Sequence, residues 1–391
     1  MRLGIYCDSA VNGGHEEMLK RLILALASSD NLETVHILVP ETNAVLFRYI
    51  TELAREHTQV RALGLSFTSE SLKGDRVALV RAIRSTANTL RTLKLSKLVV
   101  AQGTIVSGLT GLLAGRYVRV PTVSYLPLVD DPPARAGVVA NMKWIVKRVL
   151  YRMPDEFVTL NEHLRGKLSS LAPRARTMVL ENYVDDRFGR SLLTKRAARV
   201  ALGLPDDGTT IIAHIGRINF HQKRQDFLMD AIERNPEAFR QALVLIIGEG
   251  PDAARLSAMV DASPTLSACV RLVGPKGDVL PYILASDTLV LPSAFEGVPL
   301  VMIEAVLAER PIVVSRVSGL DSYLPDALLF PADDPSAFVE RIFAARDVPT
   351  SALASDFRSR FSRDVFVAQA QKIIAVAPPS SDAFELSSTQ T

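Results

Sequence analysis

The chain has 391 residues, of which 48% are hydrophobic and 22% are charged. This length and composition predict a globular protein with two domains of ordinary size. No apolar run reaches the roughly 18 residues that a membrane-spanning helix needs, and the N-terminus lacks the apolar segment of a secretion signal. The two cysteines, Cys7 and Cys269, lie far apart in the chain, so we expect neither a disulfide framework nor a cysteine metal site, and we expect a reducing, cytoplasmic location.

The net charge of +3 is distributed unevenly along the chain. Residues 1–190 carry a net charge of +8, and residues 191–391 carry a net charge of −5. A basic first half indicates an anionic partner, such as a membrane surface, a phosphorylated lipid or an acidic glycan. Solvated helix faces and a phosphate-facing cleft would produce the same excess, so both interpretations stay open. The basic half lacks the interleaved aromatic residues of a nucleic-acid-binding module, and we expect no nucleic-acid partner.

The first half of the chain alternates strand patterns with helix patterns. Strands are expected at residues 3–8, 35–39, 60–65, 97–103, 121–127 and 155–160, and the expected helices include residues 16–27, 76–95 and 142–152. This alternation predicts a doubly wound parallel sheet, whose loops converge at the carboxyl ends of the strands, where ligands bind. The Gly13-Gly14 turn, which lets backbone approach a ligand, follows the carboxyl end of one expected strand, and Gln102 lies at the carboxyl end of another.

The segment from Met142 to Arg152 interleaves basic with apolar side chains and contains the single tryptophan, Trp144. Such a helix could lie on an anionic membrane surface. It could also be an ordinary helix that packs its apolar side against the sheet, and the pattern slightly favours this second interpretation. The adjacent aspartates Asp130 and Asp131 precede two prolines, which predicts a turn before it predicts a metal site.

The second half repeats the α/β pattern, with strands expected at residues 209–216, 242–248, 270–274, 288–292, 311–315 and 327–330. The charged segment 191–202 and the turn after it indicate a boundary. We therefore expect a first domain at residues 1–186, a linker at 187–208, a second domain at 209–356 and C-terminal helices at 357–377. Residues 378–391 are polar and rich in serine and threonine, which predicts a disordered tail.

Two unusual carboxylates occur in residues 287–304, DTLVLPSAFEGVPLVMIE. This segment predicts a buried strand, a turn that contains Glu296, and an apolar helix with Pro299 in its first turn and Glu304 as its first charge. The two glutamates would lie roughly 10 Å apart along the helix axis, with free N–H groups between them. Two hydroxyl-binding carboxylates that flank an anion site suit a nucleotide-activated sugar, since one can bind the sugar and the other the ribose.

Two cations follow the first strand of the second half. Gly216-Arg217 ends that strand, and Lys223 comes six residues after Arg217. A guanidinium and an ammonium at a strand end suit a leaving diphosphate, whose negative charge grows during transfer. The loop of Gly248 after the next strand fits only half of the dinucleotide-binding pattern G-x-G-x-x-G.

The segment S-x-F-E-G-V-P-L-x-x-x-E-A resembles the signature of retaining GT-B glycosyltransferases, most closely glycosyltransferase family 4. Further similarities are the Gly13-Gly14-His15-Glu16 loop, the pair of Arg217 and Lys223, the G-x-G-P loop at residues 248–251 and the junction at Asn182. The resemblance covers essentially the whole chain and is strongest in residues 209–320. It implies two Rossmann-like domains that face each other across a cleft, with the C-terminal helices returning to the first domain.

The resemblance also implies site residues. Catalytic roles would fall to Arg217, Lys223 and Glu296. Donor-binding residues would be Gly13, Gly14, Gly216, Arg217, Lys223, Gly248, Pro275, Lys276, Glu296, Gly297, Val298, Pro299, Leu300 and Glu304. Acceptor-side candidates are His15, Gln102, Tyr125 and Asn182. The chain departs from the family at Pro127, where many members have a histidine that touches the donor sugar.

The implied function is transfer of a sugar, with retention of configuration, from a UDP- or GDP-sugar to a glycan or lipid-linked acceptor in bacterial envelope polysaccharide or lipopolysaccharide assembly. The resemblance implies neither a cofactor nor a metal, and it places the enzyme in the cytoplasm or at the inner face of the membrane. Two alternatives stay open: an inactive scaffold that binds a nucleotide or glycan, and a nucleotide-sugar epimerase. A phosphorylase would need a pyridoxal-binding lysine in a longer chain.

Overall fold

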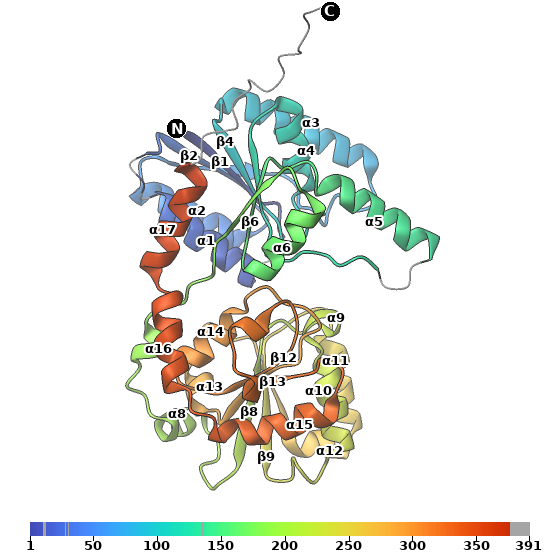
Figure 1. Ribbon diagram of the computed structural model, residues 1–391, viewed down its shortest axis with the longest axis vertical. Coiled ribbons are helices and arrows are strands. Elements are labelled where there is room, and N and C mark those ends of the chain that lie inside the picture. The colour runs from blue at the N-terminus through green and yellow to red at the C-terminus, as the bar shows by residue number, and fades with distance from the viewer. Residues whose placement is uncertain (11–12, 28, 30, 134–136, 376–391) are drawn as a thin grey trace, which may run out of the picture. The chain divides into compact units, whose positions relative to one another are not determined.

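The computed structural model describes residues 1–10, 13–27, 29, 31–133 and 137–375 (Figure 1). The tail predicted at residues 378–391 lies outside these residues. Contacts divide the chain into two units. Unit 1 comprises Met1–Thr159, Arg165–Leu180 and the described residues from Phe366 onward, and unit 2 comprises Leu160–Leu164 and Glu181–Val365.

Unit 1 is built on a seven-stranded parallel sheet in the order β3-β2-β1-β4-β5-β6-β7. Its strands are β1 (Arg2–Tyr6), β2 (Thr34–Pro40), β3 (Val60–Leu65), β4 (Lys97–Ala101), β5 (Thr122–Tyr125), β6 (Glu156–Thr159) and β7 (Arg176–Val179). The six expected strands are all present, and β7 is additional. The order reverses between β1 and β4, so the loops after these two strands border the switch point at which ligands bind in such sheets.

The helices of the first half are α1 (Gly14–Ala27), α2 (Ala44–Glu56), α3 (Arg76–Leu93), α4 (Leu109–Val118), α5 (Val138–Leu150) and α6 (Glu162–Leu171). β4 and β5 are buried along their whole length, as expected for central strands covered by helices on both faces. The sheet therefore holds the β1–α1 turn on a rigid frame.

The C-terminal helices divide between the two units. α16 (Ser351–Arg360) belongs to unit 2, whereas α17 (Arg363–Ala375) enters unit 1 from Phe366 onward. The buried Lys97 of β4 explains this attachment, because its Nζ lies 2.8 Å from Glu156 Oε1 of β6 and donates to Ile373 O of α17 at 3.0 Å. A buried ammonium needs such partners, so it ties α17 to the sheet.

Unit 2 is built on a six-stranded parallel sheet in the order β10-β9-β8-β11-β12-β13. Its strands are β8 (Thr210–Ile215), β9 (Ala242–Ile247), β10 (Val270–Gly274), β11 (Thr288–Leu291), β12 (Ile312–Ser315) and β13 (Leu329–Phe330). Its helices include α7 (Arg187–Arg190), α8 (Lys195–Leu202), α9 (Phe220–Lys223), α10 (Gln225–Arg234), α11 (Ala253–Ala262), α12 (Pro264–Cys269), α13 (Leu280–Ala285), α14 (Leu300–Leu307) and α15 (Pro335–Ala344). All six expected strands are present, and the order reverses between β8 and β11, which places the candidate cations and carboxylates at one switch point.

Residues 187–208, which we expected to be a linker, instead pack into unit 2. They contain α7 and α8, and the Arg199 side chain of α8 is buried. Its guanidinium donates to Asp287 Oδ2 at 2.6 Å and to Ala285 O at 3.0 Å. A buried guanidinium with these partners fixes α8 to the start of β11.

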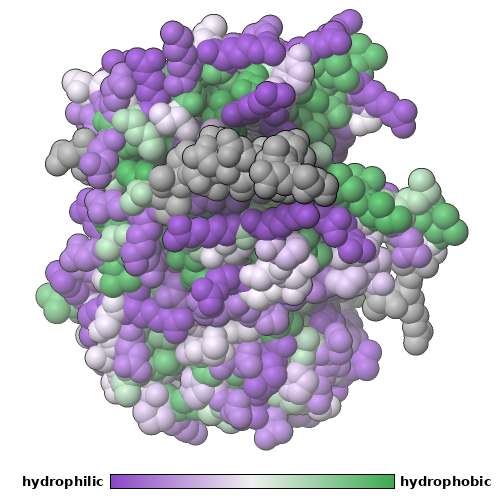
Figure 2. Space-filling model, turned by 45° about the horizontal axis from the view of Figure 1, so that its top comes forward, coloured by the Kyte–Doolittle hydropathy of each residue, from purple (hydrophilic) through white to green (hydrophobic). Residues whose placement is uncertain are grey.

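The exposure of α5 shows that the helix does not pack its apolar side on the sheet, which was the slightly favoured interpretation. Of its residues only Leu150 is buried. Six apolar side chains are each more than half exposed: Val138, Val139, Met142, Ile145, Val146 and Val149. At 100° per residue they form one stripe about 120° wide. Figure 2 shows these hydrophobic side chains projecting at the right of the view, where α5 lies in Figure 1.

The helix α5 contacts the rest of unit 1 through its polar side. Lys147 Nζ lies 2.5 Å from Asp130 Oδ1, and the hydroxyl of the following Tyr151 donates to Asp130 Oδ2 at 3.1 Å. The predicted turn at Asp130 thus anchors the helix, and the apolar stripe faces solvent. Within the described part of the chain, none of the helices combines the length and the apolar character needed to cross a membrane.

Candidate functional site

The loop between β11 and α14 holds Glu296, whose carboxylate is buried. Its Oε1 accepts hydrogen bonds from Lys223 Nζ at 2.6 Å and from Ser293 Oγ at 2.6 Å. The backbone N–H of Glu296 donates to Ser318 Oγ at 3.2 Å. These donors offset the cost of burying a carboxylate, and they fix the position of Glu296 at the carboxyl edge of the sheet.

The helix α14 begins directly after this loop. Pro299 is its N-cap and supplies no side-chain hydrogen bond to the first turn. The N–H groups of that turn can therefore bind an anion. Glu304 lies one turn further along the helix and is half-buried. The expected order of carboxylate, helix start and second carboxylate is present, with Gly297 and Val298 buried in the loop between them.

Arg217 lies in the loop after β8 and its side chain is exposed. In the described part of the chain no side chain forms an ion pair with it. Lys223, in α9, is brought toward the same edge, because a Cβ on Gly216 would lie 3.7 Å from Lys223 Cε. The structure thus places Gly216, Lys223 and Glu296 together, with Arg217 beside Gly216 in the chain.

The glycines after β9 allow the neighbouring loop to approach closely. A Cβ on Gly248 would lie 2.0 Å from Gly216 O, and a Cβ on Gly250 would lie 2.2 Å from Ile218 O. Gly248 also has a φ of +146°, which favours glycine. Ile218 N donates to Glu249 O at 2.8 Å. Gly248 therefore lets the β9 loop pack closely against the backbone of the Arg217 loop, a role that the partial G-x-G-x-x-G pattern did not predict.

Two other predicted donor-side residues lie in the loop that follows β10. Pro275 and Lys276 are exposed, and the loop is joined to the β9 loop through the hydrogen bond from Gly248 N to Gly274 O at 3.1 Å. They therefore belong to the same edge of the sheet as Arg217 and Glu296.

Asn182 is a candidate that the structure places differently. We expected it on the acceptor side, but it is buried in unit 2, and its Nδ2 donates to Val298 O at 2.6 Å. Its Oδ1 is buried and has no hydrogen-bond partner among the described residues. Asn182 therefore supports the loop that carries Glu296.

In unit 1 the start of α1 brings several candidates together. Gly13 N donates to Glu16 Oε2 at 2.9 Å, which closes the turn that precedes the helix. The His15 ring stacks on Tyr125 of β5 at a centroid distance of 5.7 Å. Both ring nitrogens of His15 are buried, and this burial lowers its pKa, while the charge of Glu16 and the backbone of Ala101 oppose the shift. Gly14 is exposed at the first position of the helix.

The expectation for Gln102 needs correction. Its side chain is fully buried, its Nε2 donates to Ile105 O at 3.1 Å and to Ser107 O, and its Oε1 accepts from Ser124 Oγ. The amide is fully used inside the β4–α4 connection, so Gln102 shapes that turn and is not free for an acceptor. Pro127, at the position of the family histidine, is also buried.

One group of side chains could hold a metal ion. Among the described residues, ligand atoms of Cys7, His15 and Glu16 lie within 4.8 Å of one another. This set would suit a zinc ion after the thiol loses its proton. Burial raises the pKa of the Cys7 thiol and so opposes that loss, and Glu16 already accepts from Gly13. Sequence spacing did not indicate this group.

Sequence reasoning missed three polar residues around the Arg217 and Glu296 loops: His214, Gln225 and Ser293. Ser293 lies inside the quoted signature, three residues before Glu296, so the sequence could have predicted that it donates to that carboxylate. His214 is surrounded by apolar residues in β8, and only the fold shows that Gln225 lies against it.

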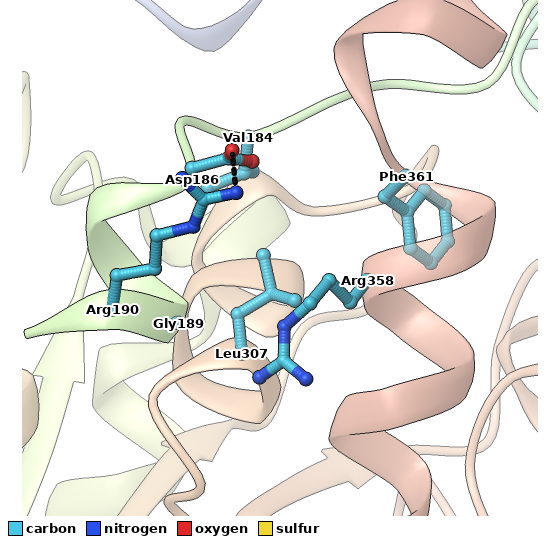
Figure 3. Close-up of a pocket in the computed structure, with 7 residues that line it drawn as sticks. All are labelled: Val184, Asp186, Gly189, Arg190, Leu307, Arg358 and Phe361. Atoms are coloured by element: carbon cyan, nitrogen blue, oxygen red, sulfur yellow. Dashed lines mark ion pairs between the residues drawn. The ribbon is translucent and has the colours of Figure 1, made fainter.

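A separate small pocket lies at the opposite end of α14 from Glu296. It is lined by Val184, Asp186, Gly189, Arg190, Leu307, Arg358 and Phe361. Figure 3 shows Arg190 directed to Asp186, with which it forms an ion pair of 3.0 Å, and Arg358 extended past Leu307. The pocket does not include any of the candidate site residues.

The structure, with its two parallel-sheet α/β units, matches GT-B glycosyltransferase structures. The similar structures include Anabaena Alr3699/HepE in complex with UDP-glucose, with a TM-score of 0.72 and 17% identity over 96% of this chain and 99% of that chain. They also include WaaG, a glycosyltransferase involved in lipopolysaccharide biosynthesis, with a TM-score of 0.68 and 14% identity over 97% of this chain and 100% of that chain. At these identities the similarity establishes the fold.

Residues 209–345, which lie in unit 2, match the family of group 1 glycosyl transferases. The D-inositol 3-phosphate glycosyltransferase 2 of Catenulispora acidiphila is 29% identical over 246 residues, which are 57% of this chain and 54% of that protein. The UDP-Gal:alpha-D-GlcNAc-diphosphoundecaprenol alpha-1,3-galactosyltransferase of Escherichia coli is 22% identical over 290 residues, 69% of this chain and 72% of that protein. The chain thus spans about half the length of the first relative.

Proposed function

We propose that this protein transfers a sugar from a nucleotide-diphosphate sugar to a glycan or lipid-linked acceptor, in the assembly of a bacterial envelope polysaccharide or lipopolysaccharide. The observation that carries the proposal is the contact of Lys223 with the buried Glu296, next to the Arg217 loop and the start of α14. The galactosyltransferase of Escherichia coli has a diphosphoundecaprenol acceptor in its name, and HepE has been solved with UDP-glucose. These relatives support transfer over epimerisation.

In the proposed donor complex, Arg217 and Lys223 bind the diphosphate, and the start of α14 binds one of its phosphates. Glu296 orients the sugar hydroxyls and Glu304 binds the ribose. Negative charge grows on the diphosphate as the bond from the sugar C1 to the phosphate oxygen breaks, so both cations stabilise the transition state more than the ground state.

We further infer that configuration is retained. Glu296 Oε1 already accepts from Lys223 and Ser293, which suits an orienting carboxylate better than a nucleophile. The acceptor hydroxyl would then attack C1 from the face that the diphosphate leaves, and its proton would pass to the leaving phosphate oxygen. We propose that no metal ion or cofactor takes part, since the two cations can supply the positive charge that the leaving group requires.

The test is the release of nucleoside diphosphate from a panel of UDP-, GDP- and ADP-sugars, with and without EDTA. Release with one donor, unchanged by EDTA, supports the proposal and names the sugar. If EDTA abolishes the release of nucleoside diphosphate, metal independence is refuted but sugar transfer is not. If a nucleotide stabilises the protein against heat but no donor releases nucleoside diphosphate, even with lipid-linked acceptors added, the result would favour the inactive scaffold. The departure from the family pattern at Pro127 is the observation that keeps this alternative open.

We also propose that α5 places unit 1 on an anionic membrane surface at the cytoplasmic face. The support is the exposed apolar stripe, which the basic residues Lys143 and Arg148 accompany on the same helix. The two cysteines are free thiols and both are buried, which suits a reducing compartment.

Vesicle flotation tests this contact. The protein should float with phosphatidylcholine vesicles that contain phosphatidylglycerol and should float less without it. Ile145→Asp should abolish flotation, because it places a charge in the stripe. The matched control is Leu192→Asp, which changes a 97% exposed leucine of unit 2 outside α5. Equal loss in both variants, or no flotation of the wild type, would refute the proposal.

A further inference from the structure

The buried amide of Gln225 supports the Arg217 loop on two sides. Gln225 is the first residue of α10 and is fully buried. Its Nε2 donates to Arg217 O at 3.0 Å, and its Oε1 accepts from Asn219 N at 3.1 Å. The loop has no regular secondary structure at these positions, so this one side chain supplies part of what fixes its backbone.

The imidazole of His214 continues the same hydrogen-bond network. Gln225 Nε2 lies 2.9 Å from His214 Nε2, and His214 Nδ1 lies 3.0 Å from Val290 O. An amide nitrogen only donates and a carbonyl oxygen only accepts, so Nε2 must accept and Nδ1 must carry the proton. Burial, opposed by the bond to Val290 and assisted by the charge of Lys223, lowers the pKa of His214 to about 4, which agrees with a neutral ring.

The network connects the two loops of the candidate site. One end is the Arg217 loop, and the other is Val290 of β11, the strand that leads to Ser293 and Glu296. The connection is reinforced beside it, because Ala294 N donates to Gln222 O at 2.8 Å. Buried hydrogen bonds therefore hold the Arg217 loop and the Glu296 loop in a fixed position relative to each other.

We propose that Gln225 and His214 are positioning residues that set where the Arg217 guanidinium meets the diphosphate of the donor. The proposal rests on the proposed function. Arg217 is exposed and forms no ion pair with the described residues, so the backbone of its loop determines where the side chain starts. Displacement of a charge-stabilising group by about 1 Å can lower a rate by about a hundredfold.

Gln225→Ala removes both backbone contacts and leaves Asn219 N and Arg217 O without these partners. We expect kcat to fall about ten- to a hundredfold with a smaller change in KM, because the lost interaction strengthens as the leaving group gains charge. A simple loss of core stability would instead lower the melting temperature without this selective effect on kcat.

A double-mutant cycle separates positioning from a structural role. The variants are Gln225→Ala, Arg217→Ala and both together, in the full chain with the donor that the panel identifies. If Gln225 acts through Arg217, its effect on kcat should disappear in the Arg217→Ala background. The same cycle on the Kd of the released nucleoside diphosphate needs no turnover and should show the same coupling.

The matched control is Thr288→Val. Thr288 is fully buried in β11, and its Oγ1 donates to Ile342 O at 3.2 Å, away from the site. It should lower stability but leave kcat unchanged. Equal effects of Gln225→Ala in both backgrounds would overturn the positioning role while the proposed function stands. A wild-type protein that turns over none of the donors would overturn both.

Discussion

Lys223 and Glu296 lie 73 residues apart in the chain, yet Lys223 Nζ donates to Glu296 Oε1 at 2.6 Å. The two residues come from the connections after β8 and β11, neighbouring strands of the second sheet. The ammonium offsets the charge of the buried carboxylate until a donor diphosphate competes for it. Binding of the donor would then leave Glu296 able to accept from sugar hydroxyls.

Glu296→Gln keeps the size of the side chain but removes its charge. We expect kcat to fall about a hundredfold, because a neutral amide oxygen accepts more weakly than a carboxylate from the sugar hydroxyls that Glu296 orients in the proposed complex. Steady-state kinetics with the donor from the panel measures the effect. Glu309→Gln, at a carboxylate after the end of α14, is the control and should behave as the wild type. Full activity of Glu296→Gln would contradict the assignment.

Arg217→Ala should lower kcat more than any other single change in the site, since the guanidinium acts on charge that develops as the sugar leaves. We expect a loss of about a hundredfold or more with a modest change in KM. Arg240→Ala, at a well-exposed arginine elsewhere in unit 2, is the control. A change confined to KM would mean that Arg217 only binds the donor.

Glu304→Ala should mainly weaken donor binding. If Glu304 holds the ribose, its contribution is the same in the ground state and in the transition state, so KM rises and kcat changes little. We expect an increase in KM of about tenfold. Calorimetric titration with the matching nucleoside diphosphate gives an independent value. An unchanged Kd would exclude Glu304 from the nucleotide site.

Lys97→Met should destabilise unit 1. It leaves Glu156 buried without its cation and removes the contact with α17, so we expect a loss of about 3–5 kcal/mol in the free energy of unfolding. Denaturant unfolding measures the loss, and Lys73→Met at an exposed lysine should be neutral. Adding Glu156→Leu to Lys97→Met should restore much of the stability. If the double variant is no better than the single one, the unpaired carboxylate is not the cause.

His214 should make unit 2 less stable in acid. The folded state holds its pKa at about 4, whereas the unfolded chain has the ordinary value of 6.5, so the unfolded state binds the proton first. The contribution of His214 to stability is therefore complete above pH 6.5 and is lost as the pH falls toward 4, by roughly 3 kcal/mol in total. Unfolding experiments at pH 7 and pH 5 test this. His214→Asn should reduce the difference between them.

The order of strands and helices could be predicted from the sequence because it depends on local periodicity and turn residues. All twelve expected strands are present. β7 was missed, since its four residues in a short, partly exposed edge strand carry too little pattern. The Glu296 loop and the start of α14 at Pro299 could also be predicted, because proline and an apolar run mark a helix start within a few residues.

Other features depend on which elements become neighbours, and local patterns contain no information about that. The amphipathic pattern of α5 was correct, and of its two interpretations the slightly favoured one, packing on the sheet, was wrong. Asp130 binds the polar side of the helix, so the apolar stripe faces outward. Gln102 was identified at a strand end and Asn182 through the resemblance of its junction, yet only the fold shows that their amides bind backbone carbonyl groups.

The sequence by itself therefore determined the two α/β units and the chemical groups of the candidate site. These follow from side-chain type and spacing over a few residues. Tertiary structure alone decided that Lys223 meets Glu296, that Gly248 gives room to Gly216, and that Gln225 and His214 join the two loops. The physical reason is that hydrogen bonds and close backbone contacts act over about 3 Å, and only the parallel pairing of β8 with β9 and β11 brings these groups within that distance.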